Sequence, residues 1–455
     1  MKELNVIILA AGLGKRMNSS LPKVLHSLAG KSLLSHVFDT ANSLLPHRIC
    51  VVYGHGNDAV RDAIGNDELI WVKQEPQLGT GHALLQALPQ LDKKGLTLVL
   101  YGDVPLISFE TLQKLISASL KERLALLTMR LDEPAGYGRI VRDTESNNII
   151  AIVEDKDTNT DQQKIKEINT GIMAIPNANL HEWLPKLENK NSQKEYYLTD
   201  IVAIAAKAGE KIEAAHPSNN WEVLGVNSKV QLAALERICQ RDYAEKLLEQ
   251  GVTLTDPSRI DIRGKLNCGK DVEVDINCIF EGEVILGVGV KIGAHCILKN
   301  VKIGAGTTVL PFSLIEDADI GKNCRVGPFS RIRPGTNLAD EIHIGNFVEI
   351  KNSSINSGSK INHLSYIGEA TVGKKVNVGA GTITCNYDGV NKFQTVIEDD
   401  VFIGSDTQLI APVKITSGST IGAGSTITIN TPPETLTLSR SKQRSIAGWK
   451  RPTKK

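Results

Sequence analysis

A glycine-rich turn followed by two cations stands near the start of the chain. Residues 6–25 read VIILAAGLGKRMNSSLPKVL, so an apolar run leads into glycines, then into Lys15 and Arg16, then into a Pro-Lys pair. The bare backbone N–H groups of such a turn bind anions readily. A P-loop would require Ser or Thr after its lysine, and a dinucleotide fingerprint would require a third glycine where Met17 stands. The segment therefore predicts an anion site that matches neither of these two phosphate motifs.

A second group of residues that could do chemistry lies in the C-terminal half. Arg333 and Lys351 are 18 positions apart, and each directly follows an aliphatic residue. Such a pair is either splayed and solvated or holds an anion between its charges, and the sequence leaves both alternatives open. His363, with Tyr366 close by, could accept a proton near neutral pH, although a lone histidine is more often only a polar surface residue.

Up to about residue 226, the elements that must position the turn alternate in type. Apolar runs at 6–11, 48–54, 96–103 and 125–131 predict buried strands, and amphipathic stretches at 32–45 and 109–124 predict helices. This alternation predicts a mostly parallel α/β sheet. Ligands of such sheets bind beyond the carboxyl ends of the strands, and residues 12–16 and 102–103 both fall at such ends.

Beyond Gly251 an aliphatic residue recurs at every sixth position. One run starts at Ile297, another at Ile320 and a third at Ile397, with slips of register between them. A sustained period of six predicts a hexapeptide-repeat parallel β-helix whose coils bury the aliphatic residues in one column. Three hexads form one coil, so residues 18 apart should be neighbours on adjacent coils, about 4.8 Å apart. Arg333 with Lys351, and Ser405 with Ala423, are predicted neighbours of this kind.

Three further segments complete the predicted organisation. Residues 228–250 predict a long helix that Asn227 or Ser228 could cap, and we interpret it as the link between two domains. Residues 385–395 interrupt the hexads and predict a projecting loop, in which Asn386 is either a binding group or only a turn residue. The tail 439–455 holds seven cations and no acid, which is typical of a solvated end and could also serve a phosphate-seeking arm. The predicted domains are residues 1–226, a linker helix at 227–250, a β-helix at 251–437 and a basic tail at 438–455.

Composition limits the class of protein. A chain of 455 residues is long for one domain, and a formal net charge of +1 gives no argument for binding nucleic acid or an anionic membrane. The seven cysteines are scattered without a C-x-x-C pair, which argues against a disulfide framework and a zinc site. No apolar run approaches the roughly 18 residues of a membrane span. We expect a soluble protein of a reducing cytosol.

The motifs together resemble known families. The turn LAAGLGKRM with the later LPK resembles the signature of sugar-nucleotide pyrophosphorylases, and the hexapeptide half resembles bacterial acyltransferases. Their union over essentially the whole chain resembles the family of bacterial bifunctional N-acetylglucosamine-1-phosphate uridylyltransferases / glucosamine-1-phosphate N-acetyltransferases. The resemblance implies that acetyl-CoA acetylates glucosamine 1-phosphate and that the product is coupled to UTP with Mg²⁺. The products would be pyrophosphate and UDP-N-acetylglucosamine, a precursor of peptidoglycan and lipopolysaccharide.

The same resemblance implies an architecture and an assembly. The first half would be a Rossmann-like nucleotidyltransferase domain, and the second a left-handed β-helix. The enzyme would be a cytoplasmic homotrimer that binds neither nucleic acid nor membrane, with each acetyl-transfer site built between subunits.

In the uridylyltransferase half, the resemblance assigns a role to each matching residue. It implies that the LAAG backbone wraps the nucleotide, that cations meet the triphosphate, that Gln74 with the Gly-Thr pair of QLGTG reads uracil, and that YGD lies beside the sugar and the metal. GYGR, IVED and EINTG would hold the sugar, and Mg²⁺ would bind Asp103 and Asn227. In this order, the residues are Leu9, Ala10, Ala11 and Gly12; Arg16 and Lys23; Gln74, Gly79 and Thr80; Tyr101, Gly102 and Asp103; and Gly138, Glu154 and Asn169.

In the acetyltransferase half, the resemblance implies that His363 is the general base and that Arg333 and Lys351 clamp the sugar phosphate. Other residues would hold the sugar or line the acetyl-CoA groove. The sugar-binding residues would be Tyr366, Asn377 and Asn386, and those of the groove would be Ala380, Ser405 and Ala423, with Tyr387 and Arg440 nearby.

Two other functions compete with this interpretation. A monofunctional sugar-nucleotide pyrophosphorylase with a regulatory β-helix would have no use for His363 beside two cations. A non-enzymatic scaffold with the same two folds, like an exchange factor, would have no use for Arg16, Lys23, Asp103 and Asn227 together.

Overall fold

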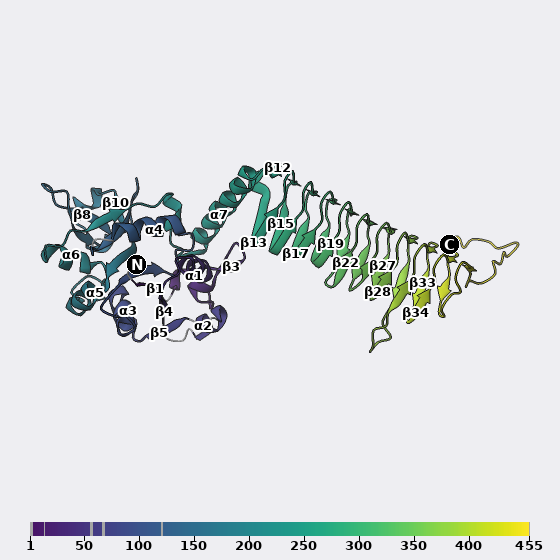
Figure 1. Cartoon of the computed structure of the whole chain (residues 1–455), viewed down its shortest axis with the longest axis horizontal. Helices are drawn as coiled ribbons and strands as arrows, with labels where there is room; N and C mark the ends of the chain where they lie inside the picture. Colours follow the sequence, from purple (N-terminus) through teal and green to yellow (C-terminus); the bar gives the residue numbers. More distant parts are fainter. Residues whose placement is uncertain (1–2, 13, 55–57, 66–68, 120–121, 455) are drawn as a thin grey trace. The chain divides into compact units, whose positions relative to one another are not determined.

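The computed structural model describes residues 3–12, 14–54, 58–65, 69–119 and 122–454. They form two compact units, Met1–Cys239 and Gln240–Lys455, and Figure 1 draws the elements of each.

The first unit is built on one twisted sheet. Within the described residues it has nine strands, in the order β11-β7-β10-β6-β1-β4-β5, with β8 paired to β10 and β9 paired to β8. The strands are β1 Leu4–Ala10, β4 Arg48–Gly54, β5 Ile70–Gln74, β6 Leu96–Tyr101, β7 Ala125–Arg130, β8 Arg139–Arg142, β9 Ile149–Val153, β10 Glu167–Pro176 and β11 Glu213–Ala215. β1 pairs in parallel with both β4 and β6, so the predicted, mostly parallel α/β sheet is confirmed. β10 runs antiparallel between β6 and β7, which the alternation of strands and helices did not predict.

Helices cover both faces of this sheet. α1 Leu33–Ser43 and α4 Phe109–Ala118 bury apolar residues against one face, and α3 Thr80–Ala87, α5 Asn177–Trp183 and α6 Asp200–Lys207 do so against the other. Both faces are therefore dry, which explains why β1 is a continuous apolar run rather than an alternating one. The remaining short elements of this unit are η1 Lys15–Met17, η2 Lys23–Leu25, the hairpin of β2 Ser27–Leu28 with β3 Lys31–Ser32, α2 Asp58–Ile64, η3 Leu88–Gln90, η4 Asp155–Asp157, η5 Gln162–Lys164, η6 Leu184–Lys186 and η7 Asn220–Val223.

The predicted long helix is α7, which spans Lys229–Glu249. In its first half Leu235 is buried with Met17, Leu28, Leu33 and Val226 of the first unit. In its second half Ala244 and Leu247 belong to the core of the second unit.

The second unit is a prism of stacked parallel strands, as β13, β15, β17 and β19 illustrate in Figure 1. Among the described residues, one sheet has the order β12-β14-β16-β18-β20-β23-β26-β29-β32-β35-β37. A second has the order β34-β31-β28-β25-β22-β19-β21-β24-β27-β30-β33-β36, with β13, β15 and β17 joined to it through β19. The predicted parallel β-helix is therefore confirmed.

The bounds of these elements follow the hexads. They are β12 Thr253–Leu254, η8 Pro257–Arg259, β13 Ile260–Cys268, β14 Glu273–Val274, β15 Cys278–Leu286, β16 Lys291–Ile292, β17 Ile297–Ile303, β18 Thr308–Val309, β19 Leu314–Ile320, β20 Arg325–Val326, β21 Arg331–Ile332, β22 Thr336–Leu338, β23 His343–Asn346, β24 Glu349–Lys351, β25 Ser354–Ile355, β26 Lys360–His363, β27 Tyr366–Gly368, β28 Ala370–Val372, β29 Asn377–Val378, β30 Ile383–Cys385, β31 Thr395–Ile397, β32 Phe402–Ile403, β33 Gln408–Ile410, β34 Val413–Ile415, β35 Thr420–Ile421, β36 Thr426–Ile427 and β37 Leu436–Thr437.

The aliphatic column predicted from the hexads fills the core of the prism, with one error. Ile320, Ile344, Ile361 and their equivalents are buried, but Leu298 is fully buried where Ile297 was expected. Leu298 is in register with the buried Ile315, 17 positions later. Alternation along β17 directs only one of two successive side chains inward, so a coil of 17 rather than 18 residues moves the buried position by one.

The interruption at 385–395 is the projecting loop that the sequence predicted. Asn377 of β29 is in register with Phe402 of β32, 25 positions later, so this coil holds an insertion. Within the insertion Tyr387 and Lys392 form an antiparallel bridge. Beyond β37 the chain is exposed from residue 438 to residue 454.

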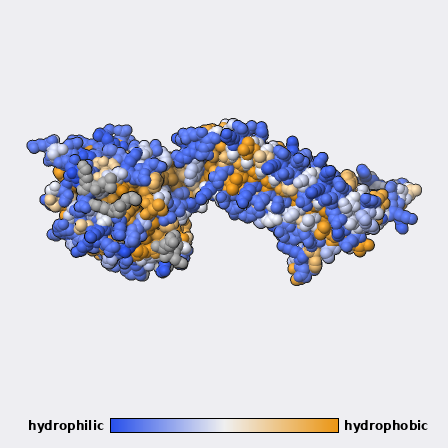
Figure 2. Space-filling view, viewed as in Figure 1, coloured by the Kyte–Doolittle hydropathy of each residue, from blue (hydrophilic) through white to orange (hydrophobic). Residues whose placement is uncertain are grey.

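Hydrophilic side chains cover most of the face drawn in Figure 2, and apolar ones gather in smaller patches. Within the part of the chain that the structure describes, no helix has the length and the apolar character that crossing a membrane requires.

Candidate functional site

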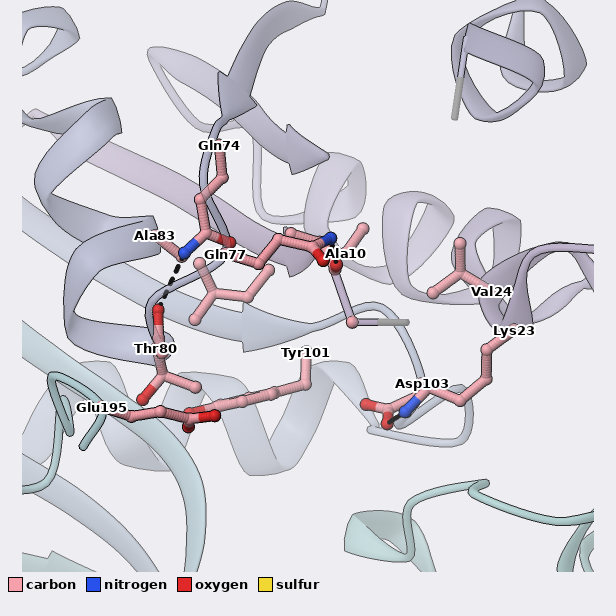
Figure 3. A pocket seen from close by; sticks show the side chains of 14 residues that line it. Ala10, Lys23, Val24, Gln74, Gln77, Thr80, Ala83, Tyr101, Asp103 and Glu195 are labelled. Carbon is pink, nitrogen blue, oxygen red and sulfur yellow. Dashed lines mark hydrogen bonds and ion pairs between the residues drawn. The ribbon is translucent and has the colours of Figure 1, made fainter. Parts of the chain in front are cut away.

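The turn and two strand ends of the first unit enclose a cleft of about 360 Å³. Leu9 and Ala10 end β1 and Ala11 and Gly12 follow it, Gln74 ends β5, and Asp103 follows β6, so the strand ends of one sheet deliver all of them to one edge. The cleft brings together ten of the residues predicted for uridylyl transfer (Figure 3). These are Leu9, Ala10, Ala11, Gly12, Lys23, Gln74, Gly79, Thr80, Tyr101 and Asp103.

Lys23 joins the two residues predicted to bind a metal. Its ammonium group donates to Oδ2 of Asp103 and to Oδ1 of Asn227, the latter at 3.0 Å. The Lys23 and Asp103 side chains are only 11% and 16% exposed, and Figure 3 shows them pointing at each other across one end of the cleft. A carboxylate and an amide oxygen thus converge on one positive charge. Oxygen donors of these types suit a hard cation such as Mg²⁺.

A second cleft adjoins the first and shares Tyr101 and Asp103 with it. It is also lined by Arg16 and Asn227, so these two predicted residues share this second cleft with Asp103. Arg16 is exposed in η1. Gly102 packs behind Asp103, where an added Cβ would lie 3.2–3.3 Å from side chains of Val24, Ala10 and Leu34.

Tyr101 separates this region from the predicted sugar-binding residues. Gly171 adopts φ +86°, and a Cβ there would lie 2.6 Å from Cε2 of Tyr101, so only glycine leaves room for the ring. Loss of water around the Tyr101 hydroxyl raises its pKa above the ordinary value, and the carboxylates of Glu154 and Asp103 add to the effect. The Tyr101 hydroxyl therefore stays uncharged at physiological pH.

The three residues predicted to hold the sugar lie together. The N–H of Asn169 donates to the carbonyl of Gly138 at 2.8 Å, and a Cβ on Gly138 would lie 3.5 Å from Oε2 of Glu154. Burial raises the pKa of the Glu154 carboxyl, and the hydroxyl of Thr199, which donates to Oε1 at 2.9 Å, opposes that shift.

At the opposite end of the cleft, Gln74 donates through Nε2 to the carbonyl of Gly79 at 2.9 Å. Gly79 has φ +105°, and a Cβ there would lie 2.7 Å from the carbonyl oxygen of Tyr196. The segment 195–198 therefore packs tightly on the QLGTG turn, and Leu198 N–H donates to Oγ1 of Thr80 at 3.1 Å.

Sequence reasoning missed two residues of this end. Gln77 donates through Nε2 to the carbonyl of Ala11, and Glu195 lines the cleft. Gln77 is the first residue of the QLGTG motif itself, which was a usable signal. Glu195 is brought in only by the packing of segment 195–198.

In the second unit, Arg333 and Lys351 follow β21 and end β24, and Ile332 is in register with Ile350. The predicted 18-residue stacking thus holds for these two cations. Each one pairs with a carboxylate that the sequence reasoning missed. Nη1 of Arg333 donates to Oε1 of Glu349 at 2.7 Å, and Nζ of Lys351 lies 3.5 Å from Oε1 of Glu369. Arg333 and Lys351 are therefore not splayed in water, because each has a carboxylate partner.

His363 ends β26 and is exposed, with its Nδ1 3.1 Å from Oδ1 of Asn346 on the preceding coil. An amide oxygen can only accept, so Nδ1 is the donor in this contact, and in the neutral ring Nε2 is then the acceptor. Tyr366 begins β27 after a short corner, and its hydroxyl lies against the Cα of Gly368. Gly368 is in register with Lys351, so Tyr366 shares the face of the two cations.

The small residues predicted for the acetyl-CoA groove form one column. Asp406 N–H donates to the carbonyl of Ala380 at 2.7 Å, and Gly424 N–H donates to that of Ser405 at 2.8 Å. Nη1 of Arg440 donates to the carbonyl of Ala423 at 2.8 Å, which ties the start of the tail to the column.

The other three predicted residues lie at different depths. Asn377 is half-buried in β29, Asn386 is buried at the start of the loop, and Tyr387 is exposed in it. The amide of Asn386 donates to Oε2 of Glu369, and the hydroxyl of Tyr387 donates within the loop to the carbonyl of Gly389.

Comparison with known proteins supports the two-part interpretation. The model of the MobA-like NTP transferase domain matches residues 6–251, the GMPPB C-terminal domain matches 262–346, and the bacterial transferase hexapeptide (six repeats) matches 394–428. "Bifunctional protein GlmU" of Nitrosospira multiformis is 67% identical over 455 residues, which cover 100% of this chain and 99% of that protein. "Bifunctional protein GlmU" of Nitrosomonas europaea is 63% identical with the same coverage. The chain belongs to the GlmU family.

Membership in the GlmU family confirms the resemblance inferred from the motifs. The chain is a bifunctional transferase of that family, with a nucleotidyltransferase part and a hexapeptide acyltransferase part, and its function is the two-step synthesis of UDP-N-acetylglucosamine. The monofunctional pyrophosphorylase and the non-enzymatic scaffold are thereby excluded.

Proposed function

We propose that the cleft of the first unit carries uridylyl transfer and that the face bearing His363 carries acetyl transfer. The observation that carries the first assignment is the convergence of Asp103 and Asn227 on one positive charge at the end of a cleft. Acetyl transfer to glucosamine 1-phosphate supplies the N-acetylglucosamine 1-phosphate that the first unit couples to UTP.

In uridylyl transfer, a phosphate oxygen of the sugar phosphate attacks the α-phosphorus of UTP. A P–O bond forms there as the bond to the leaving pyrophosphate breaks. This chemistry needs positioning and positive charge more than covalent help. The backbone of residues 9–12 wraps the nucleotide, Gln74, Gly79 and Thr80 read the base, and Arg16 and Lys23 neutralise the phosphates. Tyr101, Gly102, Gly138, Glu154 and Asn169 hold the sugar.

Asp103 and Asn227 would hold Mg²⁺, and their fit to it rests on the donor set and on the ammonium of Lys23, which stands in for a cation between them. When bound, the metal would supply further charge neutralisation at the phosphates. Lys23 must then leave its two partners, and a triphosphate in the same cleft offers its ammonium group a new one.

In acetyl transfer, the amine of glucosamine 1-phosphate attacks the thioester carbon of acetyl-CoA. Nε2 of His363 takes the amine proton, an N–C bond forms, and the C–S bond breaks to release the CoA thiolate. Asn346 fixes the tautomer that this role requires. Arg333 and Lys351 clamp the sugar phosphate, while Tyr366, Asn377 and Asn386 hold the sugar.

Acetyl-CoA lies along Ala380, Ser405 and Ala423, where small side chains leave the coil edge open, with Tyr387 and Arg440 beside it. Backbone N–H groups along this edge stabilise the thioester oxyanion.

The proposal extends to assembly and organisation. We propose a homotrimer, in which a neighbouring subunit completes the acetyl-transfer site around the exposed His363. A lone chain would then lack that activity. The boundaries 1–226, 227–250, 251–437 and 438–455 and a cytoplasmic location are part of the same proposal, as is the absence of nucleic-acid and membrane partners.

The test is to give the purified protein UTP, Mg²⁺, acetyl-CoA and glucosamine 1-phosphate and to identify the product by mass. UDP-N-acetylglucosamine is expected, and it should disappear when acetyl-CoA is omitted and return when N-acetylglucosamine 1-phosphate is added.

Two variants test the division of labour between the units. His363→Ala is expected to abolish acetyl transfer and spare uridylyl transfer, and Asp103→Ala is expected to do the reverse. Loss of both activities in either variant would contradict separate sites. An unchanged Mg²⁺ requirement in Asp103→Ala would contradict its role as a metal ligand.

A further inference from the structure

One corner of the β-helix holds a column of residues with left-handed backbone. Its members have φ between +44° and +79° and include Gly282, Asn300, Asp317, Gly335, Asn352 and Glu369. Gly, Asn and Asp are the residue types that tolerate this conformation best. Glu369 is the exception in this column, and its longer side chain places a carboxylate at this corner.

The Glu369 side chain is only 13% exposed and contacts two segments far apart in the sequence. Its Oε1 lies 3.5 Å from Nζ of Lys351 on the preceding coil and 3.6 Å from Nζ of Lys392 in the inserted loop. Its Oε2 accepts a hydrogen bond from Nδ2 of Asn386, where the loop begins. Its backbone carbonyl accepts from the N–H of Thr395 at 3.1 Å, where the loop ends.

From these contacts we infer that Glu369 is the positioning residue of the acetyl-transfer site, because it fixes Lys351, Asn386 and both ends of the loop 386–394 in one arrangement. The inference rests on the proposed acetyl-transfer function and adds to it a residue to which no role is assigned above. Glu369 itself touches no substrate.

The chemistry of each partner explains what this arrangement achieves. Lys351 has a long flexible side chain, and a partly buried carboxylate restricts it before the sugar phosphate arrives. A carboxylate can only accept, so the Asn386 amide donates to Glu369 through Nδ2. Oδ1 of Asn386 is therefore turned away from Glu369. Asn386 therefore presents an acceptor, and the group that it recognises on the sugar is a donor, either a hydroxyl or the amine.

The experiment compares Glu369→Ala and Glu369→Gln with Asp317→Ala, a control that removes a carboxylate from the same corner three coils earlier. Steady-state acetyl transfer is measured with each substrate varied in turn. Glu369→Ala is expected to raise KM for glucosamine 1-phosphate by about tenfold or more, as loss of hydrogen bonds to a charged group implies. KM for acetyl-CoA, uridylyl transfer and the thermal midpoint should stay unchanged, and Asp317→Ala should match the parent. Glu369→Gln keeps an acceptor for Asn386 and should fall between the parent and Glu369→Ala.

A double-mutant cycle separates positioning from mere loop stability. If Glu369 acts through Lys351 and Asn386, the losses in Glu369→Ala and Asn386→Ala should overlap, so the double variant Glu369→Ala/Asn386→Ala should lose less than their sum. Additive losses would overturn the inference, as would an unchanged or lowered KM for glucosamine 1-phosphate in Glu369→Ala. If that variant fails to fold, Glu369→Gln decides by the same criterion. A parent protein without acetyl transfer would instead refute the proposed function itself.

Discussion

Gly171 offers a sharp test of how the first unit positions Tyr101. It lies where the pairing of β10 with β7 shifts register, and its φ of +86° is strained for any other residue. A Cβ at Gly171 would lie 2.6 Å from a ring carbon of Tyr101, whereas Gly136 has the same φ of +86° and open space around its Cβ position. Gly136→Ala is therefore a matched control that carries the backbone strain without the clash.

The expected magnitudes follow from that comparison. Left-handed backbone costs an alanine about 1–2 kcal/mol in either variant. The Gly171 variant must also move the Tyr101 ring by ~1 Å to reach ordinary contact, and overpacking of this kind costs about 1–3 kcal/mol. For a unit of this size, that difference corresponds to roughly 2–12 °C in Tm. Tyr101 lines both clefts, so uridylyl transfer should fall in Gly171→Ala well below its value in Gly136→Ala.

Thermal unfolding followed by tryptophan fluorescence is a suitable assay. Three of the four tryptophans, Trp71, Trp183 and Trp221, lie in the first unit, so the signal reports mainly on it. Acetyl transfer should be equal in both variants. Equal melting temperatures for the two variants, or loss of uridylyl transfer in Gly136→Ala alone, would refute the reasoning.

Three other perturbations test the remaining parts of the structure. Lys23→Met should tighten Mn²⁺ binding to the nucleotide-free protein by about tenfold or more in titration calorimetry, because the metal no longer displaces a hydrogen-bonded ammonium group. Lys31→Met, at an exposed ion pair, should leave Mn²⁺ binding unchanged. Equal binding in both variants would contradict competition between Lys23 and the metal. Burial raises the pKa of Glu154, so its ionisation costs stability as pH rises from about 4.3 through the raised native value. Glu154→Gln should therefore raise Tm more at pH 7.5 than at pH 4, and a gain that does not depend on pH would argue against it. Ile361→Ala removes a fully buried side chain of the β-helix and should lower the free energy of unfolding by about 2–5 kcal/mol in denaturant titrations. Ile446 is 77% exposed, so Ile446→Ala should lower the free energy of unfolding little. Equal losses in the two variants would contradict the stacked core.

The cleft of the first unit was largely predictable because parallel strands carry their carboxyl ends to one edge of a sheet. Residues 9–12 and Asp103 lie at the ends of strands that the apolar runs had located, so their proximity followed from topology. Glu195 was not predictable, because it reaches the cleft through contacts of segment 195–198 with residues more than a hundred positions away. Local patterns carry no information on such packing.

In the β-helix the hexads predicted the core and the neighbouring positions of Arg333 and Lys351. They failed at Ile297 because a coil can have 17 residues as well as 18, and spacing in one coil does not reveal where the corner shortens. The same stacking arithmetic could have found Glu349 and Glu369. Glu349 lies two positions before Lys351, the stacked neighbour of Arg333, and Glu369 directly follows Gly368, which is in register with Lys351.

The sequence by itself determined which periodicities the chain has, and therefore that an α/β sheet precedes a β-helix and that phosphate-binding chemistry is available in both. Only the tertiary structure decided how charges are paired. Lys23 meets Asp103 and Asn227 across 80 and 204 positions, and Glu369 joins Lys351 to a loop inserted after β30. The periodicity of apolar residues can be recognised within one strand or one coil, because it depends only on residues close together in the sequence. The partner of a buried charge depends on which distant segments the folded core brings within hydrogen-bonding distance.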